Sequence, residues 1–417
     1  MTALDLLNKL CLILVVLTSI CFCYQIFYLL IPLTGKRKLP EKTALRRYAI
    51  LIAARNEEAV LPHLLESIRA QDYPAELISA FVVADNCTDR TAEAAEKHGA
   101  TVFTRSNRKL VGKGYAIAYL LDEIQKNIGL SQFDAFLIFD ADNLLSVDYI
   151  QKINALPSVG YQAFCGYRNT KNFGMNWLTS GYGLWYLHES SHMNRSRMRI
   201  GCGCAVNGTG FGFTRQLLEQ LGGWPFFTLT EDIEFNSWCA TNGIKIGYCH
   251  DAVAFDEQPF SFRQSWRQRT RWVQGGLQVS MKYTGRLFGG MLRGGWKGYT
   301  CYELTTLSMW GFGLATLTGC LSLVLSVLTL PLPSAILTLL AAFCSAYLSL
   351  FAMGAWTLIL EWRRIYATTA QKLCSVLTFP LFMMTFAPIA LTALFRKFEW
   401  APIDHTVAIS SEELLTK

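Results

Sequence analysis

The sequence predicts an α/β domain with a mostly parallel β-sheet, flanked by helices that cross a membrane. Short apolar runs alternate with helix-like segments in the middle of the chain, and long uncharged stretches lie near both ends. Only 17% of the 417 residues are charged and 52% are hydrophobic, whereas about a quarter of the residues in a soluble domain are charged. The composition therefore excludes a wholly soluble, secreted or fibrous protein.

Three stretches of the chain contain no Asp, Glu, Lys, Arg or His: residues 10–35, 304–360 and 373–395. A helix needs about 20 apolar residues to cross the roughly 30 Å hydrocarbon layer of a bilayer. The stretches therefore fit one span, two spans and one further apolar segment.

The first stretch is predicted to be a retained anchor, because its apolar core is too long for a signal peptide and no cleavage site follows. Basic residues come directly after it: Lys36, Arg37, Lys38, Arg46 and Arg47. Positive flanks stay on the cytoplasmic side of a membrane, so we expect residues 40–300 to be cytosolic. The 13 cysteines then lie in a reducing compartment and form no disulfide framework.

The last stretch contains Pro380 and Pro388, and basic residues follow it at Arg396. A full crossing would place these charges on the outer face, against the positive-inside tendency. We therefore expect a re-entrant or interfacial segment, with a full span as the alternative. The tail residues would then stay on the cytosolic side and could approach the active site: Trp400, Asp404 and His405.

Three apolar runs read as buried strands: 48–53, 78–84 and 135–139. Each is followed by a helix-like segment: 58–70, 88–98 and 146–155. This alternation predicts a parallel sheet covered on both faces, with ligands bound where strands end. Polar clusters occupy that edge: Arg55-Asn56-Glu57, Asp85-Asn86 and Asp140-Ala141-Asp142.

These patterns divide the chain into an N-terminal anchor (1–36), a catalytic domain (37–258), a basic interfacial segment (259–302), two transmembrane helices (303–362) and a third apolar segment with a tail (363–417). The interfacial segment carries eight Lys or Arg and no acid, interleaved with Trp. Such a stretch suits a membrane surface. We prefer lipid to nucleic acid as its partner because it adjoins the longest apolar stretch.

Two acidic motifs could carry chemistry. Asp140 and Asp142 flank one residue at a strand end, and such carboxylates suit Mg²⁺ or Mn²⁺; the alternative is a turn that caps the next helix. Thr230-Glu231-Asp232 opens a helical segment, where a Thr cap followed by acids is ordinary. The same position could instead hold a carboxylate as a general base.

The string Gln268-Arg269-Thr270-Arg271-Trp272 places an amide, a guanidinium and an indole on one helix face. Arg can bind a diphosphate in bidentate fashion, and Trp offers a flat wall for a sugar. The alternative is an amphipathic interfacial helix whose Arg side chains reach the headgroups.

Seven motifs occur in the following order: Ala54-Arg55-Asn56-Glu57-Glu58, Ala84-Asp85-Asn86-Cys87-Thr88-Asp89, Gly112-Lys113-Gly114, Asp140-Ala141-Asp142, Asn207-Gly208-Thr209-Gly210, Thr230-Glu231-Asp232 and Gln268 to Trp272. Together they resemble the membrane-embedded family 2 glycosyltransferases, which include cellulose, chitin and hyaluronan synthases. The resemblance covers about residues 45 to 275.

The resemblance implies a GT-A fold and transfer from a nucleotide-activated sugar, usually UDP-linked, with inversion at the anomeric carbon. It implies these roles by position: Asn56, Glu57 and Asp85 for the base and ribose, Lys113 and Asp140 for the nucleotide, Asp142 for Mg²⁺ or Mn²⁺, Asp232 as general base, and Gln268, Arg271 and Trp272 over the diphosphate and the acceptor. At Asn86 this sequence departs from the second Asp that many members carry. The resemblance therefore supports the nucleotide contacts at this position least.

Within this resemblance we expect a processive synthase that passes a polysaccharide through a cell membrane, with a multi-pass topology and a cytoplasmic catalytic domain. The few spans give a thin wall for a pore, so a homo-oligomer or an accessory export subunit would be needed. The alternative is transfer of one sugar to a lipid, as in ceramide glucosyltransferases. The expected partners are a UDP-sugar, a polysaccharide or lipid acceptor and membrane lipids, with no nucleic acid. A catalytically inactive scaffold is disfavoured because the matching acids are intact.

A competing motif, His188-Glu189-Ser190-Ser191-His192, fits the H-E-x-x-H of zinc proteases. Its metzincin extension fails because Arg195 stands where a glycine is needed and Met198 where a third histidine is needed. Cys202 and Cys204 form a C-x-C with no second pair nearby. We therefore expect neither to bind zinc.

Overall fold

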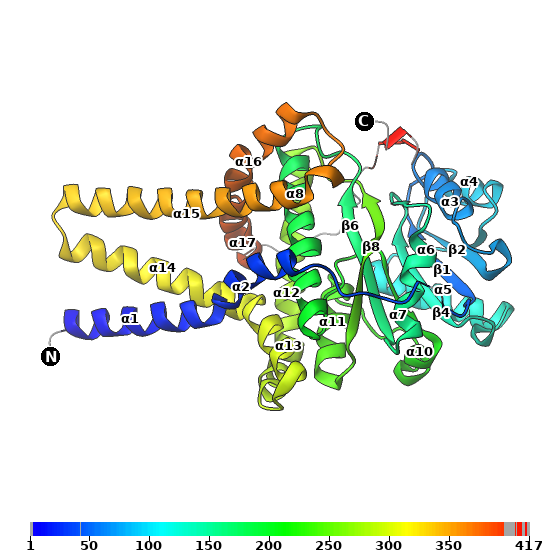
Figure 1. The fold of residues 1–417 in the computed structure, drawn as a ribbon, viewed down its shortest axis with the longest axis horizontal. Coiled ribbons are helices and arrows are strands. Elements are labelled where there is room, and N and C mark those ends of the chain that lie inside the picture. The colour runs from blue at the N-terminus through cyan, green and yellow to red at the C-terminus, as the bar shows by residue number, and fades with distance from the viewer. Residues whose placement is uncertain (1–2, 42, 396–404, 406, 411–412, 415–417) are drawn as a thin grey trace.

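A computed structural model describes residues 3–41, 43–395, 405, 407–410 and 413–414. It shows an α/β domain from one side of which three helices project (Figure 1). These are α1 (Ala3–Phe22), α14 (Met309–Thr329) and α15 (Leu332–Glu361).

The first half of the sheet consists of parallel strands in the spatial order β3-β2-β1-β4. They are β1 (Tyr48–Ala54), β2 (Ile78–Asp85), β3 (Thr101–Arg105) and β4 (Ala135–Asp140). The five residues from Tyr48 to Ile52 are each 0% exposed, because helices cover both faces of a parallel sheet and its strands become continuous apolar runs. The three strands predicted from apolar runs are confirmed.

The second half continues the sheet in the order β7-β6-β8-β5. Its strands are β5 (Leu144–Leu145), β6 (Ala163–Thr170), β7 (Phe211–Thr214) and β8 (Ile246–Asp256). β6 and β8 pair in parallel, whereas β7 is antiparallel to both β4 and β6, and β5 is antiparallel to β8. The sheet is thus mixed and mostly parallel. Between Gly166 and Tyr167 the pairing of β6 with β8 shifts register at a bulge.

Short helices pack on both halves of the sheet, and the last two of them, from Tyr149 to Ser158, contact β6 and β8. They are α3 (Leu61–Arg69), α4 (Thr91–Lys97), α5 (Lys113–Asn127), α6 (Tyr149–Ile153) and α7 (Ala155–Ser158), with 3₁₀ turns at Ala75–Leu77 and Leu130–Gln132. α3 packs on α4, while α5 contacts β1, β2 and β3. The predicted segments 58–70 and 88–98 are helical, and the predicted segment 146–155 contains two short helices.

Further helices join the sheet to the apolar part of the chain. They are α8 (Trp177–His188), a π-helical turn (Glu189–Asn194), α9 (Arg195–Ile200), α10 (Arg215–Leu221), α11 (Glu231–Asn242), α12 (Phe262–Met291) and α13 (Gly295–Thr306). α8 begins with a capping box, in which Asn176 accepts from the Thr179 backbone amide and Thr179 accepts from that of Asn176.

Four helical segments are long and apolar enough to cross a membrane by length and composition: Leu4–Thr34, Trp310–Thr329, Leu332–Arg364 and Thr369–Phe395. The first includes α2 (Tyr24–Leu30) and a 3₁₀ turn (Ile31–Thr34), and the third ends in a 3₁₀ turn (Trp362–Arg364). α1 packs against α14, where the Oγ1 atoms of Thr18 and Thr318 lie 2.9 Å apart. The most apolar windows of the first and third segments are only 6% and 0% buried, so most of their surface is free to face lipid.

The last apolar segment folds as α16 (Thr369–Met384) and α17 (Phe386–Phe395), which run across the direction of α1, α14 and α15 (Figure 1). α16 packs on α8 and α17 on α12. The contact requires glycine at position 181, because an added Cβ would lie 2.4 Å from the Phe382 ring. The interfacial interpretation of this segment stays a prediction, and Arg396, Trp400 and Asp404 lie outside the described residues.

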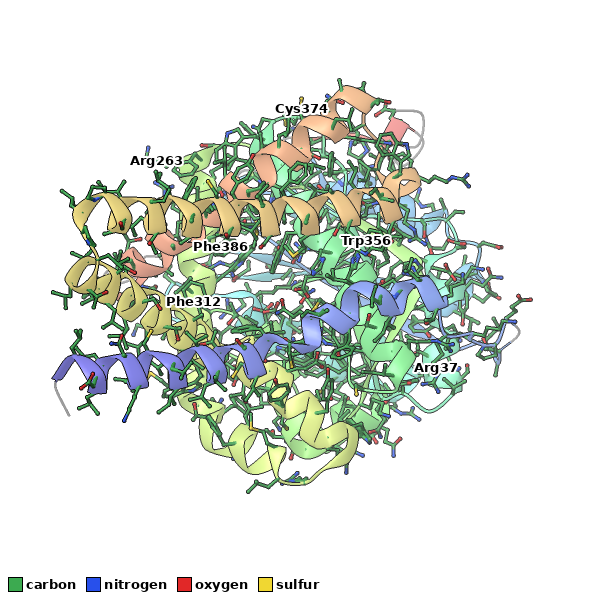
Figure 2. All side chains as sticks on the ribbon, turned by 60° about the vertical axis from the view of Figure 1, so that its left-hand side comes forward. Arg37, Arg263, Phe312, Trp356, Cys374 and Phe386 are labelled. Carbon is green, nitrogen blue, oxygen red and sulfur yellow. The ribbon has the colours of Figure 1, made fainter. Side chains whose placement is uncertain are left out.

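The apolar helices dock on the domain through polar contacts. Trp356 of α15 points toward α2 (Figure 2), where its Nε1 donates to the Leu29 carbonyl oxygen at 2.9 Å. At the end of α15, Glu361 accepts from the Tyr167 hydroxyl at 2.8 Å. The ion pair of Arg197 on α9 with Glu303 on α13 is buried, with an N–O distance of 3.3 Å and side chains 2% and 1% exposed.

We expect Arg197→Ala to destabilise the protein by about 3–5 kcal/mol, because it leaves the Glu303 carboxylate buried without its cation. Thermal unfolding of the purified chain in detergent measures the effect. Arg199→Ala is the matched control, since Arg199 is exposed on the same helix. Equal unfolding midpoints for the two variants would contradict this assignment.

Candidate active site

The candidate site is the crevice at the carboxyl edge of the sheet, where β1 lies between β2 and β4. Ligands bind at such positions because successive crossovers leave the sheet in opposite directions. The three polar clusters predicted from the sequence follow these strands, and two of them contain Asn56 and Asn86, which adopt left-handed backbone conformations (φ 57° and 55°). They are the two non-glycine residues with positive φ in the described part of the chain.

Lys113 connects two loops of the crevice. Its Nζ donates to Oδ1 of Asp140 and, at 2.7 Å, to the Gly208 carbonyl oxygen. The Asp140 amide donates to Oγ1 of Thr209 at 3.0 Å. The acidic motif and the motif at 207–210 are therefore held together before any ligand binds.

Asp142 is 5% exposed, and its Oδ2 accepts from the Glu257 backbone amide at 2.8 Å. Burial favours the neutral acid, but His405 and Lys171 outweigh it and hold the pKa of Asp142 below its ordinary value. Asp142 is thus a carboxylate in a charged crevice, as a ligand for a divalent cation must be.

Asp142 and Asp140 supply the hard oxygen atoms that Mg²⁺ or Mn²⁺ prefers. No three His, Cys, Asp or Glu side chains of the described residues form a ready-made metal cage. The donor set therefore fits a cation that completes its coordination with water and the phosphate oxygens of a bound ligand, as Mg²⁺ commonly does.

Glu231 and Asp232 open α11 at the far wall of the crevice. Thr230 stands at the N-cap of this helix and acids occupy its first turn, as the ordinary interpretation expects, but the Thr230 side chain makes no capping hydrogen bond. Burial raises the pKa of Glu231 to about 7 and also raises the pKa of Asp232, although Lys113 and Arg271 oppose both shifts. A Cβ at Gly208 would lie 3.9 Å from Oδ2 of Asp232, so Asp232 faces the loop that Lys113 binds.

Arg168 and Asp256, which were not predicted from the sequence, lie in the same crevice. The guanidinium of Arg168 donates from Nε to Oδ2 of Asp256 at 2.7 Å and also bonds the Asn207 carbonyl oxygen. It lies 3.6 Å from the centroid of the Tyr186 ring. Burial raises the pKa of Asp256 to about 6 despite this partner. The polar run Asp256-Glu257-Gln258 at the end of a strand could have predicted this side of the crevice, as such runs did after the other strands.

The residues expected to hold the nucleoside already form hydrogen bonds within the protein. Oδ1 of Asn56 accepts from the Thr88 amide at 2.8 Å, which joins the loops after β1 and β2. Asp85 is buried and accepts from Arg105 at 2.6 Å. Glu57 contacts the C-terminal tail at His405.

Of the three residues predicted on one face of α12, Arg271 and Trp272 contact the walls of the crevice. Nη1 of Arg271 donates to the Leu229 carbonyl oxygen at 3.1 Å, directly before α11. The Trp272 ring lies edge-on to Tyr182 and Tyr186, at centroid distances of 5.9 and 6.5 Å. Oε1 of Gln268 is buried and has no hydrogen-bond partner among the described residues.

The tail returns to the crevice, as the interfacial prediction allowed. Nδ1 of His405 lies 2.9 Å from Oε1 of Glu57. Although burial lowers the pKa of His405, the carboxylates of Asp142, Glu57 and Glu257 raise it to about 10. Lys171 donates to the Val407 carbonyl oxygen at 2.8 Å and so holds a second point of the tail against the domain.

The H-E-x-x-H motif lies elsewhere, at the junction of α8 with α15. The rings of His188 and His192 stack at 4.7 Å, and Nδ1 of His188 lies 3.3 Å from Oγ1 of Thr357. Burial lowers the pKa of these histidines to about 4 and about 3. The motif is thus a buried packing contact in the described part of the chain. Cys202 and Cys204 are buried free thiols.

The sequence profile of Glycosyltransferase like family 2 matches residues 46–275, which is more than half of the chain. The chain belongs to this family. The matched range contains every predicted site residue.

Three curated relatives show what this member of the family is similar to. It is 25% identical to a probable glycosyltransferase, YdaM, of Bacillus subtilis over 61% of this chain and 62% of that protein. It is 26% identical to the beta-monoglucosyldiacylglycerol synthase of Synechocystis (56% and 48% covered) and 24% to the poly-beta-1,6-N-acetyl-D-glucosamine synthase of Staphylococcus epidermidis (56% and 55%). The chain spans about half to three fifths of the length of these relatives.

A solved structure shows the same fold. The mannosyltransferase PcManGT of Pyrobaculum calidifontis, in complex with GDP-Man and Mn²⁺, matches 92% of this chain and 99% of its own at a TM-score of 0.58 and 18% identity. The family 2 glycosyltransferase therefore has the predicted GT-A fold flanked by apolar helices.

The raised pKa of Asp232 gives a test in solution. If Asp232 accepts a proton during catalysis, kcat/KM falls as the pH falls through an apparent pKa above the ordinary aspartate value of about 3.9. Arg271→Gln removes a positive charge that opposes this shift, so we expect the acidic limb to move to higher pH. Rates of nucleotide release from pH 4 to 9 measure it. A limb that does not move, or that moves to lower pH, would contradict the coupling.

Proposed function

We propose that this protein is a metal-dependent, inverting glycosyltransferase that moves a sugar from a UDP-sugar to an acceptor at the membrane. One observation carries the proposal: Lys113 joins the 140–142 loop to the loop that Asp232 faces, and Arg271 of α12 bonds the backbone directly before the helix of Asp232. Membership of the family supports glycosyl transfer. The geometry adds a carboxylate that could take the acceptor proton and cations that could stabilise the departing diphosphate.

In the proposed reaction the acceptor oxygen bonds to the anomeric carbon while the bond from that carbon to the diphosphate oxygen breaks. The acceptor proton passes to Asp232, whose raised pKa suits a general base. Negative charge develops on the departing diphosphate, and the Lys113 ammonium and the Arg271 guanidinium stabilise it. The products are the glycosylated acceptor and UDP.

Asp142, with Asp140 beside it, would hold a Mg²⁺ or Mn²⁺ ion, which when bound supplies further positive charge at the diphosphate. Lys113 holds Asp140 in place for this role. The mannosyltransferase of the same fold was solved with Mn²⁺ and a nucleotide sugar, which supports a divalent cation here.

The donor would lie along the carboxyl edge of the sheet. Asn56, Glu57 and Asp85 would contact the uracil and ribose, with Asp85 already oriented by Arg105. Gln268 has a buried amide oxygen without a described partner, so a hydroxyl of the donor or acceptor could complete its bonding.

The acceptor side favours a growing polysaccharide. Trp272 is partly exposed and packs edge-on against the buried rings of Tyr182 and Tyr186, an aromatic wall beside Arg168. The exposed part of the Trp272 ring would suit the flat apolar face of a sugar. The similarity to the N-acetyl-D-glucosamine polymer synthase of Staphylococcus epidermidis supports this choice. Since α1 and α15 are largely exposed, a second copy or an accessory subunit would complete the wall of an export channel.

The second candidate is transfer of a single sugar to a lipid. It is favoured by the same exposed helices, because a lipid can approach the aromatic wall sideways from the bilayer without any enclosed channel. The similarity to the Synechocystis beta-monoglucosyldiacylglycerol synthase also supports it.

We place the catalytic domain on the cytoplasmic side, in a multi-pass arrangement. Lys36, Arg37 and Lys38 follow the first apolar segment directly, and basic flanks remain in the cytoplasm. Nucleotide sugars would be available to the crevice on that side.

We expect Asp232→Asn to lower kcat by about 10²–10⁴-fold, the usual contribution of a general base. Asp122→Asn on α5 is the matched control, since Asp122 is an exposed carboxylate away from the crevice. Release of UDP from UDP-glucose, UDP-N-acetylglucosamine, UDP-galactose and UDP-glucuronate measures both variants. Unchanged turnover in Asp232→Asn would remove the proposed base.

Product length separates the two acceptor classes. The purified full chain in nanodiscs, given labelled UDP-sugars and Mn²⁺, is expected to form a high-mass polymer that a glycosidase degrades. Radiolabel that instead moves with one glycolipid band would establish the single-transfer alternative.

A further inference from the structure

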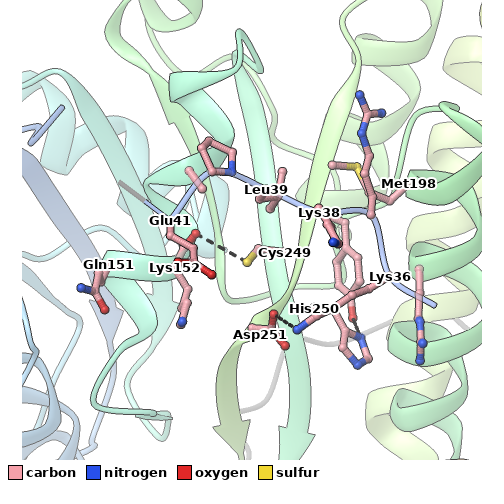
Figure 3. Close-up of a pocket in the computed structure, with 15 residues that line it drawn as sticks. Lys36, Lys38, Leu39, Glu41, Gln151, Lys152, Met198, Cys249, His250 and Asp251 are labelled. Atoms are coloured by element: carbon pink, nitrogen blue, oxygen red, sulfur yellow. Dashed lines mark hydrogen bonds and ion pairs between the residues drawn. The ribbon is translucent and has the colours of Figure 1, made fainter. Parts of the chain in front are cut away.

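A second concave site lies on the flank of the domain, away from the catalytic crevice. Figure 3 shows this flank pocket, a cavity of about 550 Å³ between the segment that follows the first apolar helix and the middle of β8. Its walls include Lys36 to Glu41 on one side and Tyr248 to Asp251 on the other. A cavity of 300–1,000 Å³ is the usual size of a small-molecule site.

The flank pocket carries a surplus of positive charge. Five Lys or Arg line it against two acids, and the basic residues are Lys36, Arg37, Lys38, Lys152 and Arg195. The acids are Glu41 and Asp251. Asp251 is already shared, since it pairs with Lys36 and lies 3.7 Å from Nη2 of Arg364. The pocket therefore contains more cations than its own acids can neutralise.

Several of these cations have no anionic partner in the described part of the chain. Lys38 and Lys152 are exposed and form no ion pair there. Nε of Arg195 is buried and has no hydrogen-bond partner among the same residues. A buried donor left unbonded costs free energy, so an acceptor from a ligand would be favourable here.

The groups around the flank pocket also leave its positive charge uncompensated. Burial, together with Arg364, Arg195 and Lys36, lowers the pKa of His250 to about 2, so the imidazole is neutral and cannot compensate an acid. A second groove of about 360 Å³ shares Arg195 and His250 and adds Arg363 and Arg364 to the basic surface.

We propose that the flank pocket binds a small molecule through a phosphate or diphosphate group. Phosphate oxygens accept hydrogen bonds from the fork of an Arg and from Lys ammonium groups. Leu39, Pro40, Ala155 and Met198 give the same cavity an apolar side, which would receive the organic part of the ligand.

A phosphate group could come from a soluble metabolite or from a lipid headgroup. The pocket begins at Lys36, two residues after the apolar segment Leu4–Thr34, and extends along the side of the domain to the middle of β8 (Figure 3). Both sources can therefore reach it, and the two arms of the test separate them. The site is independent of the proposed transferase reaction.

The test is equilibrium binding of radiolabelled pyrophosphate to the full chain in neutral-lipid nanodiscs, with EDTA present. We expect Lys38→Glu/Lys152→Glu to weaken the binding at least tenfold, while Lys97→Glu/Lys126→Glu, an equal change of charge on exposed α4 and α5, leaves it unchanged. Lys113→Ala should also retain this binding, because Lys113 lies in the catalytic crevice and not in the flank pocket.

A second arm replaces pyrophosphate by nanodiscs that contain phosphatidylglycerol and measures the thermal unfolding midpoint. Stabilisation by this lipid that Lys38→Glu/Lys152→Glu abolishes would support the phosphate site and assign it to a headgroup. If pyrophosphate and the lipid each act equally on the wild type, the flank-pocket variant and the control variant, the proposal is wrong. Loss of pyrophosphate binding only in Lys113→Ala would also overturn it.

Discussion

Charge compensation among closely placed carboxylates is the constraint on which the rest of this structure depends. The carboxyl edge of the sheet brings the buried Asp142 and Asp256 and the partly exposed Asp140 into one crevice, with Asp232 on its far wall, and ionised acids cannot be gathered in this way without cations. Each wall supplies one: Lys113 bonds Asp140, and Arg168 bonds Asp256. The crevice is consequently organised by ion pairs that a donor diphosphate and a metal ion would rearrange on binding.

The catalytic half of the fold could be predicted because its signals are local. Apolar runs such as Ala135–Phe139 form fully buried strands, and the polar residues that follow them must lie at one edge of a parallel sheet. Lys113 and Asp232 were assigned to that site because the motifs that contain them resemble those of the family. The short strands β5 and β7 were not predicted, since two to four residues carry too little periodicity to recognise.

Contacts between residues far apart in the sequence were the hardest to predict. Arg168 precedes its partner Asp256 by nearly ninety positions and was missed. His405 was expected near the site, but its partner Glu57, at the opposite end of the chain, was not predicted. Neither Arg168 nor His405 belongs to a motif, so only the topology brings each to its partner. At Thr230 a common local pattern indicated a helix cap, and the residue stands at the N-cap, but its side chain makes no capping hydrogen bond. Local patterns identify elements well, whereas charge partners depend on how those elements are arranged.

The bulge in β8 separates two parts of one strand. Cys249 pairs with Gly166 and Val253 with Tyr167, so the three residues between Cys249 and Val253 have no counterpart on β6. His250 and Asp251, which line the flank pocket, belong to this unpaired stretch, while Asp256 at the crevice lies in the regular ladder beyond it. A bulge leaves its extra residues outside the ladder. Substitutions at His250 or Asp251 would therefore change the flank pocket without breaking the backbone pairing that holds Asp256 at the crevice.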